Sequence, residues 1–218
     1  MDFNTVIFDM DGLLIDSEPL WMEASTEVFA YYGKKISAEE YTTTTGLRTS
    51  EFVSWWLRDY KFDNSELEKA GDKIVELVIQ KIKEKGKAMT GYEHIFEFFY
   101  RKNYKVGLAT SSPMSIVDAV TELLGIEEYI QVKTSAEKLA YGKPHPQVYL
   151  ECAKALNVSP MQCICFEDSI NGMIAVKAAR MKCVVVPAYH QIKDERWSLA
   201  DLKISSLKNF SELHIGLL

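Results

Sequence analysis

The sequence predicts an α/β protein with a doubly wound parallel sheet, a Rossmann-like core, that is interrupted by an inserted all-helical cap. Short β-branched runs alternate with helical patterns after residue 100, whereas residues 17–87 show helical patterns and no convincing strand. The chain has 218 residues, of which 47% are hydrophobic, and this composition is enough to bury a substantial core. We therefore expect a core domain formed by residues 1–16 and 88–218 and a cap domain formed by residues 17–87.

The first predicted strand is the apolar run at residues 6–8, which leads directly into Asp9-Met10-Asp11-Gly12. Because side chains alternate along a strand, Asp9 and Asp11 should leave the sheet in the same direction. Two carboxylates in one small space repel each other unless a cation or a proton intervenes. Gly12 removes a side chain where the chain has to turn sharply. The pattern indicates a metal site, acid–base chemistry or both, although by itself it also fits a strand followed by a simple turn.

The predicted cap contains two spacings typical of capping boxes, Ser37 with Glu40 and Ser65 with Glu68. Residues 16–18 are expected to cap the first helix of the cap. An apolar stripe at helical spacing follows the second capping box and comprises Leu67, Ala70, Ile74, Leu77, Val78 and Ile82. These features predict helices throughout the cap.

The core pattern resumes after the cap, with strands predicted at residues 105–109, 129–133, 163–166 and 183–186. Helices are predicted at 113–124, 146–156 and 169–179. Ser112 and Ser169 are placed to cap the first and third of these helices, and Gly125 to end the first. Strands that alternate with helices in this way favour a parallel sheet covered by helices on both faces.

Polar side chains follow the ends of the predicted strands. They are Thr110 and Ser111 after the second strand, Lys143 in a later loop, and Glu167-Asp168 after the fourth strand. Ligands bind at the carboxyl edge of an open parallel sheet, so these residues should meet Asp9 and Asp11 there. A nucleophilic carboxylate, a second carboxyl group, an acidic pair, a hydroxyl and a lysine are the parts that phosphoryl transfer requires. Taken individually, each of these residues could also be a turn residue, a helix cap or a solvent-exposed residue without a catalytic role.

Composition excludes several classes of function. The formal charge of −6 and the pI near 5.3 disfavour a nucleic-acid partner. The four cysteines lack metal-binding spacing and are expected to be reduced core residues. No charged segment followed by an apolar run precedes the first strand, and no apolar run approaches the ~20 residues of a membrane helix. We expect a cytoplasmic monomer that interacts with neither nucleic acid nor membrane.

Four motifs then carry a family resemblance: DMDGLLIDSE at 9–18, LATSS at 108–112, GKPHP at 142–146 and FEDSING at 166–172. Over nearly its whole length the chain resembles haloacid-dehalogenase-superfamily phosphohydrolases of the β-phosphoglucomutase-like group, which have a helical cap. Residues 135–150 and 167–181 are especially similar to the bacterial hexitol and 2-deoxyglucose-6-phosphate phosphatases.

The resemblance implies that Asp9 attacks phosphorus to form an aspartyl phosphate, while Asp11 protonates the leaving group and then activates water. An ordinary aspartate, with a pKa near ~3.9, would be an ionised nucleophile at neutral pH. Thr110, the Ser111 backbone N–H and Lys143 would hold the phosphoryl oxygens. The implied ligands of Mg²⁺ are the Asp9 side chain, the Asp11 backbone carbonyl and Asp168, with Glu167 bound directly or through water.

The implied reaction is Mg²⁺-dependent hydrolysis of small sugar or sugar-alcohol phosphates. The alternative is a β-phosphoglucomutase-type sugar phosphomutase, but Trp21 stands where those mutases have a cap-base histidine. A receiver-like signalling domain or a catalytically silent phospho-ligand-binding module fits less well, because Asp9 follows the first strand and the acidic residues are intact. Arg48, in Gly46-Leu47-Arg48, could bind a sugar hydroxyl or a second anion.

Overall fold

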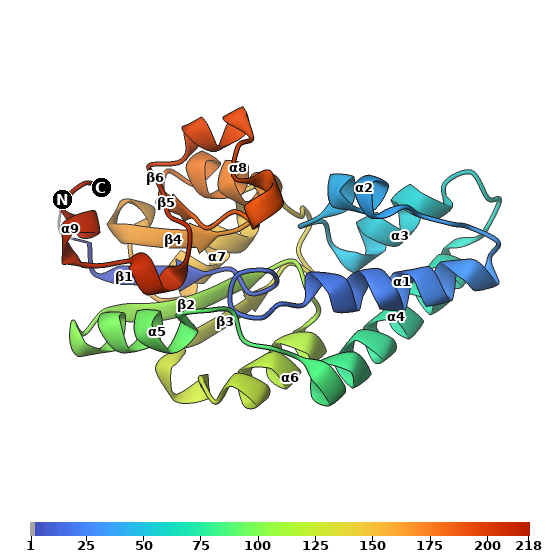
Figure 1. Ribbon diagram of the computed structural model, residues 1–218, viewed down its shortest axis with the longest axis horizontal. Helices are drawn as coiled ribbons and strands as arrows, with labels where there is room; N and C mark the ends of the chain where they lie inside the picture. Colours follow the sequence, from blue (N-terminus) through green and yellow to red (C-terminus); the bar gives the residue numbers. More distant parts are fainter. Residues whose placement is uncertain (1–2) are drawn as a thin grey trace.

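The computed structural model describes residues 3–218, so Met1 and Asp2, with which the predicted core begins, lie outside the described residues. Six strands form one parallel sheet in the order β3-β2-β1-β4-β5-β6 (Figure 1). The strands are β1 (Thr5–Phe8), β2 (Lys105–Thr110), β3 (Val132–Ser135), β4 (Cys163–Glu167), β5 (Lys182–Val185) and β6 (Leu202–Lys203). The predicted α/β class with a parallel sheet is confirmed.

Helices cover both faces of the sheet. On one face lie α5 (Tyr92–Arg101) and α6 (Met114–Leu124), and on the other lie α7 (Gln147–Ala155) and α8 (Ile170–Ala178). The central strand β1 supplies both cores because its side chains alternate: Phe8 packs with α5 and α6, whereas Ile7 packs with α7 and α8. This is the doubly wound arrangement that the sequence predicts. A short helix, α9 (Glu212–Ile215), follows the sheet.

Four α-helices lie between β1 and α5: α1 (Glu18–Tyr31), α2 (Ala38–Tyr41), α3 (Thr49–Leu57) and α4 (Asn64–Lys85). Within the described residues, the chain between β1 and β2 adds no strand to the sheet. Figure 1 shows these helices gathered beside the sheet, with α1 and α4 packed together. We call residues 17–87 the helical segment. That it forms a separate cap domain with these boundaries stays a prediction.

The caps predicted for helices α4 and α6 are not those of the structure. Helix α4 begins at Asn64, and its cap is Asp63, whose carboxylate accepts a hydrogen bond from the Glu66 N–H. The predicted capping box of Ser65 with Glu68 is therefore wrong. Helix α6 begins at Met114, and Ser112 does not cap it. The capping box at Ser37 and the cap at Ser169 are confirmed.

The third strand is also displaced from its predicted position. It runs from Val132 to Ser135, and the predicted strand residue Tyr129 lies instead in a 3₁₀ turn. The Tyr129 ring packs against Phe96 and Tyr100 of α5, which holds this residue off the sheet. The four cysteines are buried free thiols, as expected. Within residues 3–218, no helix combines the length and apolar composition needed to cross a membrane.

Candidate active site

Asp9 is the first residue after β1 and lies at the carboxyl edge of the sheet. Its backbone N–H donates to the Phe166 carbonyl at 3.0 Å, which extends the pairing of β1 with β4, and its side chain is buried. The following turn passes close to Asp168: Gly12 has a φ of +71°, and a Cβ there would lie 2.0 Å from Asp168 Oδ2. Glycine is therefore required at this position both by the backbone conformation and by the nearby carboxylate.

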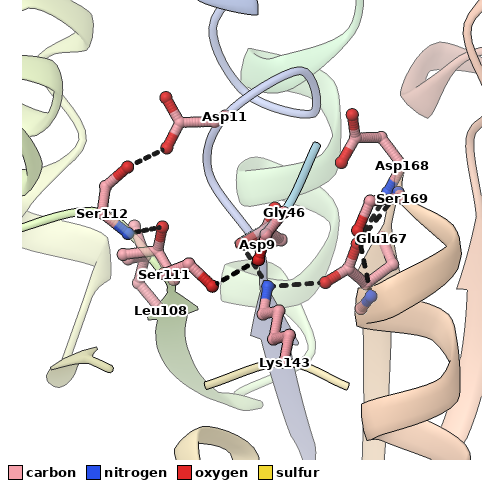
Figure 2. Close-up of polar contacts among 12 residues, drawn as sticks. Asp9, Asp11, Gly46, Leu108, Ser111, Ser112, Lys143, Glu167, Asp168 and Ser169 are labelled. Carbon is pink, nitrogen blue, oxygen red and sulfur yellow. Dashed lines mark hydrogen bonds and ion pairs between the residues drawn. The ribbon is translucent and has the colours of Figure 1, made fainter. Parts of the chain in front are cut away.

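Lys143 is the cation at the centre of the site, although it comes from the loop between β3 and α7. Its ammonium donates to Asp9 Oδ1 and to Glu167 Oε1, both at 2.6 Å (Figure 2). The Lys143 side chain is only 1% exposed, so these two ion pairs are shielded from water. Although burial lowers the pKa of Lys143, the Asp9 and Glu167 carboxylates raise it further, and the ammonium remains charged.

The Glu167 carboxylate is fully buried and accepts five hydrogen bonds. Oε1 accepts from Lys143 and from the Tyr149 hydroxyl, the latter at 2.5 Å. Oε2 accepts from the backbone N–H groups of Asp168 and Ser169 and from the Ser169 hydroxyl, at 3.0 to 3.1 Å. Glu167 therefore orients Lys143 through a fixed network. No motif in the sequence indicates the contact of Tyr149 with Glu167.

The centre of the site carries more negative than positive charge. The side chains of Asp9, Glu167 and Asp168 offer oxygen atoms that lie within 4.8 Å of one another, and Lys143 is their buried cationic partner. Burial, only partly offset by the Lys143 charge, raises the pKa of Asp9 to about 8. Burial and the neighbouring carboxylates also raise the pKa of Asp168. The expectation that Asp9 keeps an ordinary pKa is therefore wrong for the site without a further cation.

This donor set fits a small divalent cation. The oxygen atoms are hard ligands, they are buried together, and they carry charge that a divalent cation would neutralise. The acidic cluster is thus present where the sequence predicts it.

Asp11 lines the same cavity but has its own partners. Its Oδ1 accepts hydrogen bonds from the Ser17 hydroxyl at 2.6 Å and from Trp21 Nε1 at 2.9 Å, and its Oδ2 accepts from the Ser112 hydroxyl at 2.6 Å. Figure 2 shows Asp11 beside Ser112, with Asp168 on the other side of Asp9. The sequence predicts that Ser17 caps α1, but its side chain makes no capping hydrogen bond, because its hydroxyl donates to Asp11 instead. Trp21 connects the helical segment to Asp11.

The last residue of β2 and the loop that follows it bring three hydroxyl side chains to the cavity. The Thr110 hydroxyl accepts a hydrogen bond from the Ser112 N–H at 3.1 Å. The Ser111 hydroxyl donates to the Gly46 carbonyl of the helical segment at 2.7 Å. Thr110 and Ser111 are both buried. The loop is thus fixed internally and also bound to the helical segment.

A small cavity of about 50 Å³, which we call the catalytic cavity, lies between the sheet edge and the helical segment. The predicted residues Asp9, Asp11, Thr110, Ser111 and Lys143 line it, as does Asp168. Residues that the sequence did not indicate as site residues also line it, including Glu18, Tyr41, Thr44, Thr45, Thr49 and Phe52. They come from the helical segment and share no local motif, so only the tertiary structure could identify them.

Arg48 does not line the catalytic cavity. Its guanidinium donates to the Leu139 carbonyl at 2.7 Å and to Glu51 Oε1 at 2.6 Å. Arg48 thus links the helical segment to the core loop that leads to Lys143. A second core contact is made by Asn171, whose side-chain amide donates to the Thr45 carbonyl at 3.1 Å.

Comparisons with known proteins agree with this architecture. A family model described as haloacid dehalogenase-like hydrolase matches residues 6–186. The chain is 42% identical to hexitol phosphatase B of Escherichia coli (strain K12), over 92% of this chain and 91% of the relative. It is 33% identical to a phosphorylated carbohydrates phosphatase of Thermotoga maritima, over 81% of both chains. A crystal structure of β-phosphoglucomutase from Clostridium difficile superposes with a TM-score of 0.89 at 26% identity, covering 98% of this chain and 96% of that one.

Proposed function

The chain belongs to the haloacid dehalogenase-like hydrolase family and is a phosphoric monoester hydrolase, and from this premise we propose that it hydrolyses small sugar or sugar-alcohol phosphates. The observation that carries the proposal is the buried Asp9–Lys143 pair on the catalytic cavity, next to Asp11 and Asp168. The relatives named for hexitol and carbohydrate phosphates support the substrate class.

In the proposed mechanism, Asp9 Oδ attacks phosphorus and the bond to the sugar oxygen breaks. Asp11 donates a proton to the departing alkoxide, and the product alcohol leaves an aspartyl phosphate on Asp9. Asp11 then takes a proton from water, which attacks phosphorus and releases phosphate and free Asp9. Lys143, the Thr110 hydroxyl and the Ser111 N–H would hold the phosphoryl oxygens as negative charge shifts among them.

The residues that would hold Mg²⁺ are Asp9, Asp168 and the Asp11 carbonyl. Glu167 already accepts five hydrogen bonds, and this favours contact through water over direct binding. When bound, Mg²⁺ would neutralise the crowded carboxylates and draw negative charge from the phosphoryl group. A cytoplasmic location and a monomeric state remain part of this proposal.

Phosphate release from a panel of sugar and polyol phosphates, with and without Mg²⁺, tests the proposal. We expect Mg²⁺-dependent release by the wild type and none by Asp9→Asn, whose fold is checked by circular dichroism, because an amide is a poor nucleophile. Failure to hydrolyse any member of the panel, or full activity of Asp9→Asn, would contradict it. Interconversion of hexose 1- and 6-phosphates without phosphate release would instead identify the phosphomutase alternative.

A further inference from the structure

Tyr149 is a fully buried tyrosine that the proposed mechanism does not use. It lies in the first turn of α7, on the buried face of that helix with Cys152 and Ala153. The ring packs in the apolar core, and a hydroxyl carried into such a core is unfavourable unless it has a hydrogen-bond partner. The partner is Glu167 Oε1, at 2.5 Å. The Tyr149 hydroxyl therefore connects α7 to the charged centre of the active site.

Tyr149 also contacts the cation of the site. Lys143 Nζ lies 5.1 Å from the centroid of the Tyr149 ring, and a ring attracts an ammonium over distances up to about 6 Å. The same nitrogen atom donates to Glu167 Oε1 at 2.6 Å. Tyr149 thus acts on both members of one buried ion pair, because its ring attracts the ammonium and its hydroxyl holds the oxygen atom that the ammonium binds.

The Glu167 carboxylate is confined on its other sides. A Cβ on Gly172 of α8 would lie 1.7 Å from Glu167 Oε1, so the carboxylate rests against the backbone of that helix. Oε2 is held by three donors from the turn after β4 (Figure 2). The donors to Oε1 among the described residues are the Tyr149 hydroxyl and the Lys143 ammonium. Without the hydroxyl, the position of Oε1 would depend on the same ammonium that it is meant to hold.

This anchor matters most during the reaction. An ammonium has three N–H groups; Lys143 donates two to Asp9 and Glu167, and it lines the catalytic cavity, where the third can reach a phosphoryl oxygen. When Asp9 becomes phosphorylated, its attacking oxygen is bonded to phosphorus and its carboxyl group no longer carries its own charge. Of the two ion pairs that Lys143 makes among residues 3–218, the one with Glu167 then remains.

We propose that Tyr149 is a positioning residue for phosphoryl transfer: through Glu167 and through its own ring, it holds the Lys143 ammonium in place while Asp9 carries the phosphoryl group. This inference rests on the proposed mechanism and deepens it, because it adds a residue that does not line the catalytic cavity. Since Tyr149 acts through Lys143 and touches no substrate, its hydroxyl should stabilise the transition state more than it stabilises the bound substrate.

Removing the hydroxyl gives the first test. Tyr149→Phe keeps the ring, its packing and its attraction for the ammonium. With 4-nitrophenyl phosphate and saturating Mg²⁺, we expect kcat to fall about tenfold while KM stays within about twofold of the wild-type value. The matched control is Tyr92→Phe, which removes a tyrosine hydroxyl that donates to Glu93 on the exposed surface of α5 and should change neither constant.

Inhibition by orthovanadate gives a readout that does not depend on turnover. Vanadate with five oxygen ligands resembles the transition state of phosphoryl transfer, and a residue that acts on the transition state affects such a mimic more than a ground-state ligand. In Tyr149→Phe, the inhibition constant of orthovanadate should rise by about the same factor as kcat falls, and that of inorganic phosphate should change much less.

Two further measurements separate positioning from loss of stability and from an effect on the cation. Thr121→Val removes a buried hydroxyl beside the ion pair of Lys133 with Glu127, away from the catalytic cavity, and should lower stability to urea without changing kcat. The Mg²⁺ concentration that gives half of the maximal thermal shift should be the same in Tyr149→Phe as in the wild type, because Tyr149 acts through Lys143.

A fluorine label tests the connection in a protein that keeps the hydroxyl. With 3-fluorotyrosine incorporated at Tyr149, the fluorine resonance should move when orthovanadate and Mg²⁺ bind, because the charges around Lys143 and Glu167 change. The same label at Tyr92 should give no such shift. This measurement holds even if Tyr149→Phe fails to fold.

The outcomes separate this inference from the proposed function. If the wild type hydrolyses no phosphate ester, the proposed function fails. If the wild type is active, any one of four results would overturn the role of Tyr149 alone. They are an unchanged kcat in Tyr149→Phe, an equal rise in the inhibition constants of vanadate and phosphate, a Mg²⁺ requirement that rises as much as kcat falls, and a fluorine resonance at position 149 that does not respond to vanadate.

Discussion

Replacing Lys143 by methionine should strongly destabilise the protein, because the ammonium compensates the buried Glu167 carboxylate and, above a pH of about 8, that of Asp9 as well. The Lys143 side chain is 1% exposed, and its partners Asp9 and Glu167 are 8% and 0% exposed. Removing one partner of a buried ion pair leaves an uncompensated charge, which costs about 3–5 kcal/mol. We expect Lys143→Met to lower the free energy of unfolding by about this amount when no divalent cation is present.

Urea denaturation in EDTA, followed by circular dichroism, measures this loss. The matched control is Lys177→Met, which breaks the ion pair between Lys177 and Asp201, whose side chains are 35% and 16% exposed. Because that pair is partly solvated, its loss should cost about 1 kcal/mol or less. The difference between the two variants isolates the effect of burial.

The cause of the loss can be tested by removing the orphaned charge as well. In the double variant Lys143→Met with Glu167→Gln, the amide keeps the shape of Glu167 but carries no charge, so part of the lost stability should return. If Lys143→Met costs no more than Lys177→Met, or if the double variant is less stable than Lys143→Met, the reasoning about uncompensated charge is wrong.

Three further predictions follow from the site. Asp11→Asn should slow hydrolysis of alkyl phosphates more than that of an aryl phosphate, whose leaving group needs no proton; equal losses measured by steady-state kinetics would contradict the acid role. Arg48→Ala removes the contacts to Leu139 and Glu51. The fall in kcat/KM should correspond to a loss of about 1–3 kcal/mol in transition-state stabilisation, the range for a charged hydrogen bond. A loss confined to sugar phosphates would support the predicted sugar contact, and an equal loss on an aryl phosphate would support a linking role. Stabilisation by Mg²⁺ should grow as pH rises from about 6 to about 8, because Asp9 has a pKa of about 8 and must lose its proton to bind the cation. The thermal shift between Mg²⁺ and EDTA at each pH measures this, and a pH-independent shift would contradict it.

Local sequence patterns were sufficient to predict the sheet and the residues at its carboxyl edge. Strands recur with a regular spacing, and the carboxyl ends of parallel strands meet at one edge, so Asp9, Thr110, Lys143 and Asp168 could be grouped from sequence. The starts of the helices were harder to predict, because a side chain with the sequence context of a helix cap can form a tertiary contact instead. Ser112 had the sequence context of a helix cap, yet its hydroxyl donates to Asp11.

The sequence alone thus determined the class of fold and which polar side chains gather at the floor of the catalytic cavity, because both depend on short motifs placed at strand ends. The tertiary structure decided the rest of the site: the contact of Trp21 with Asp11, the hydrogen bond of Arg48 to the Leu139 carbonyl of the core, and the position of Thr49 on the catalytic cavity. These features depend on how the helical segment packs against the core, through contacts such as Asn171 with Thr45, which are 126 residues apart. No local periodicity or motif encodes a contact of that separation, because its geometry is set only when both parts of the chain have folded.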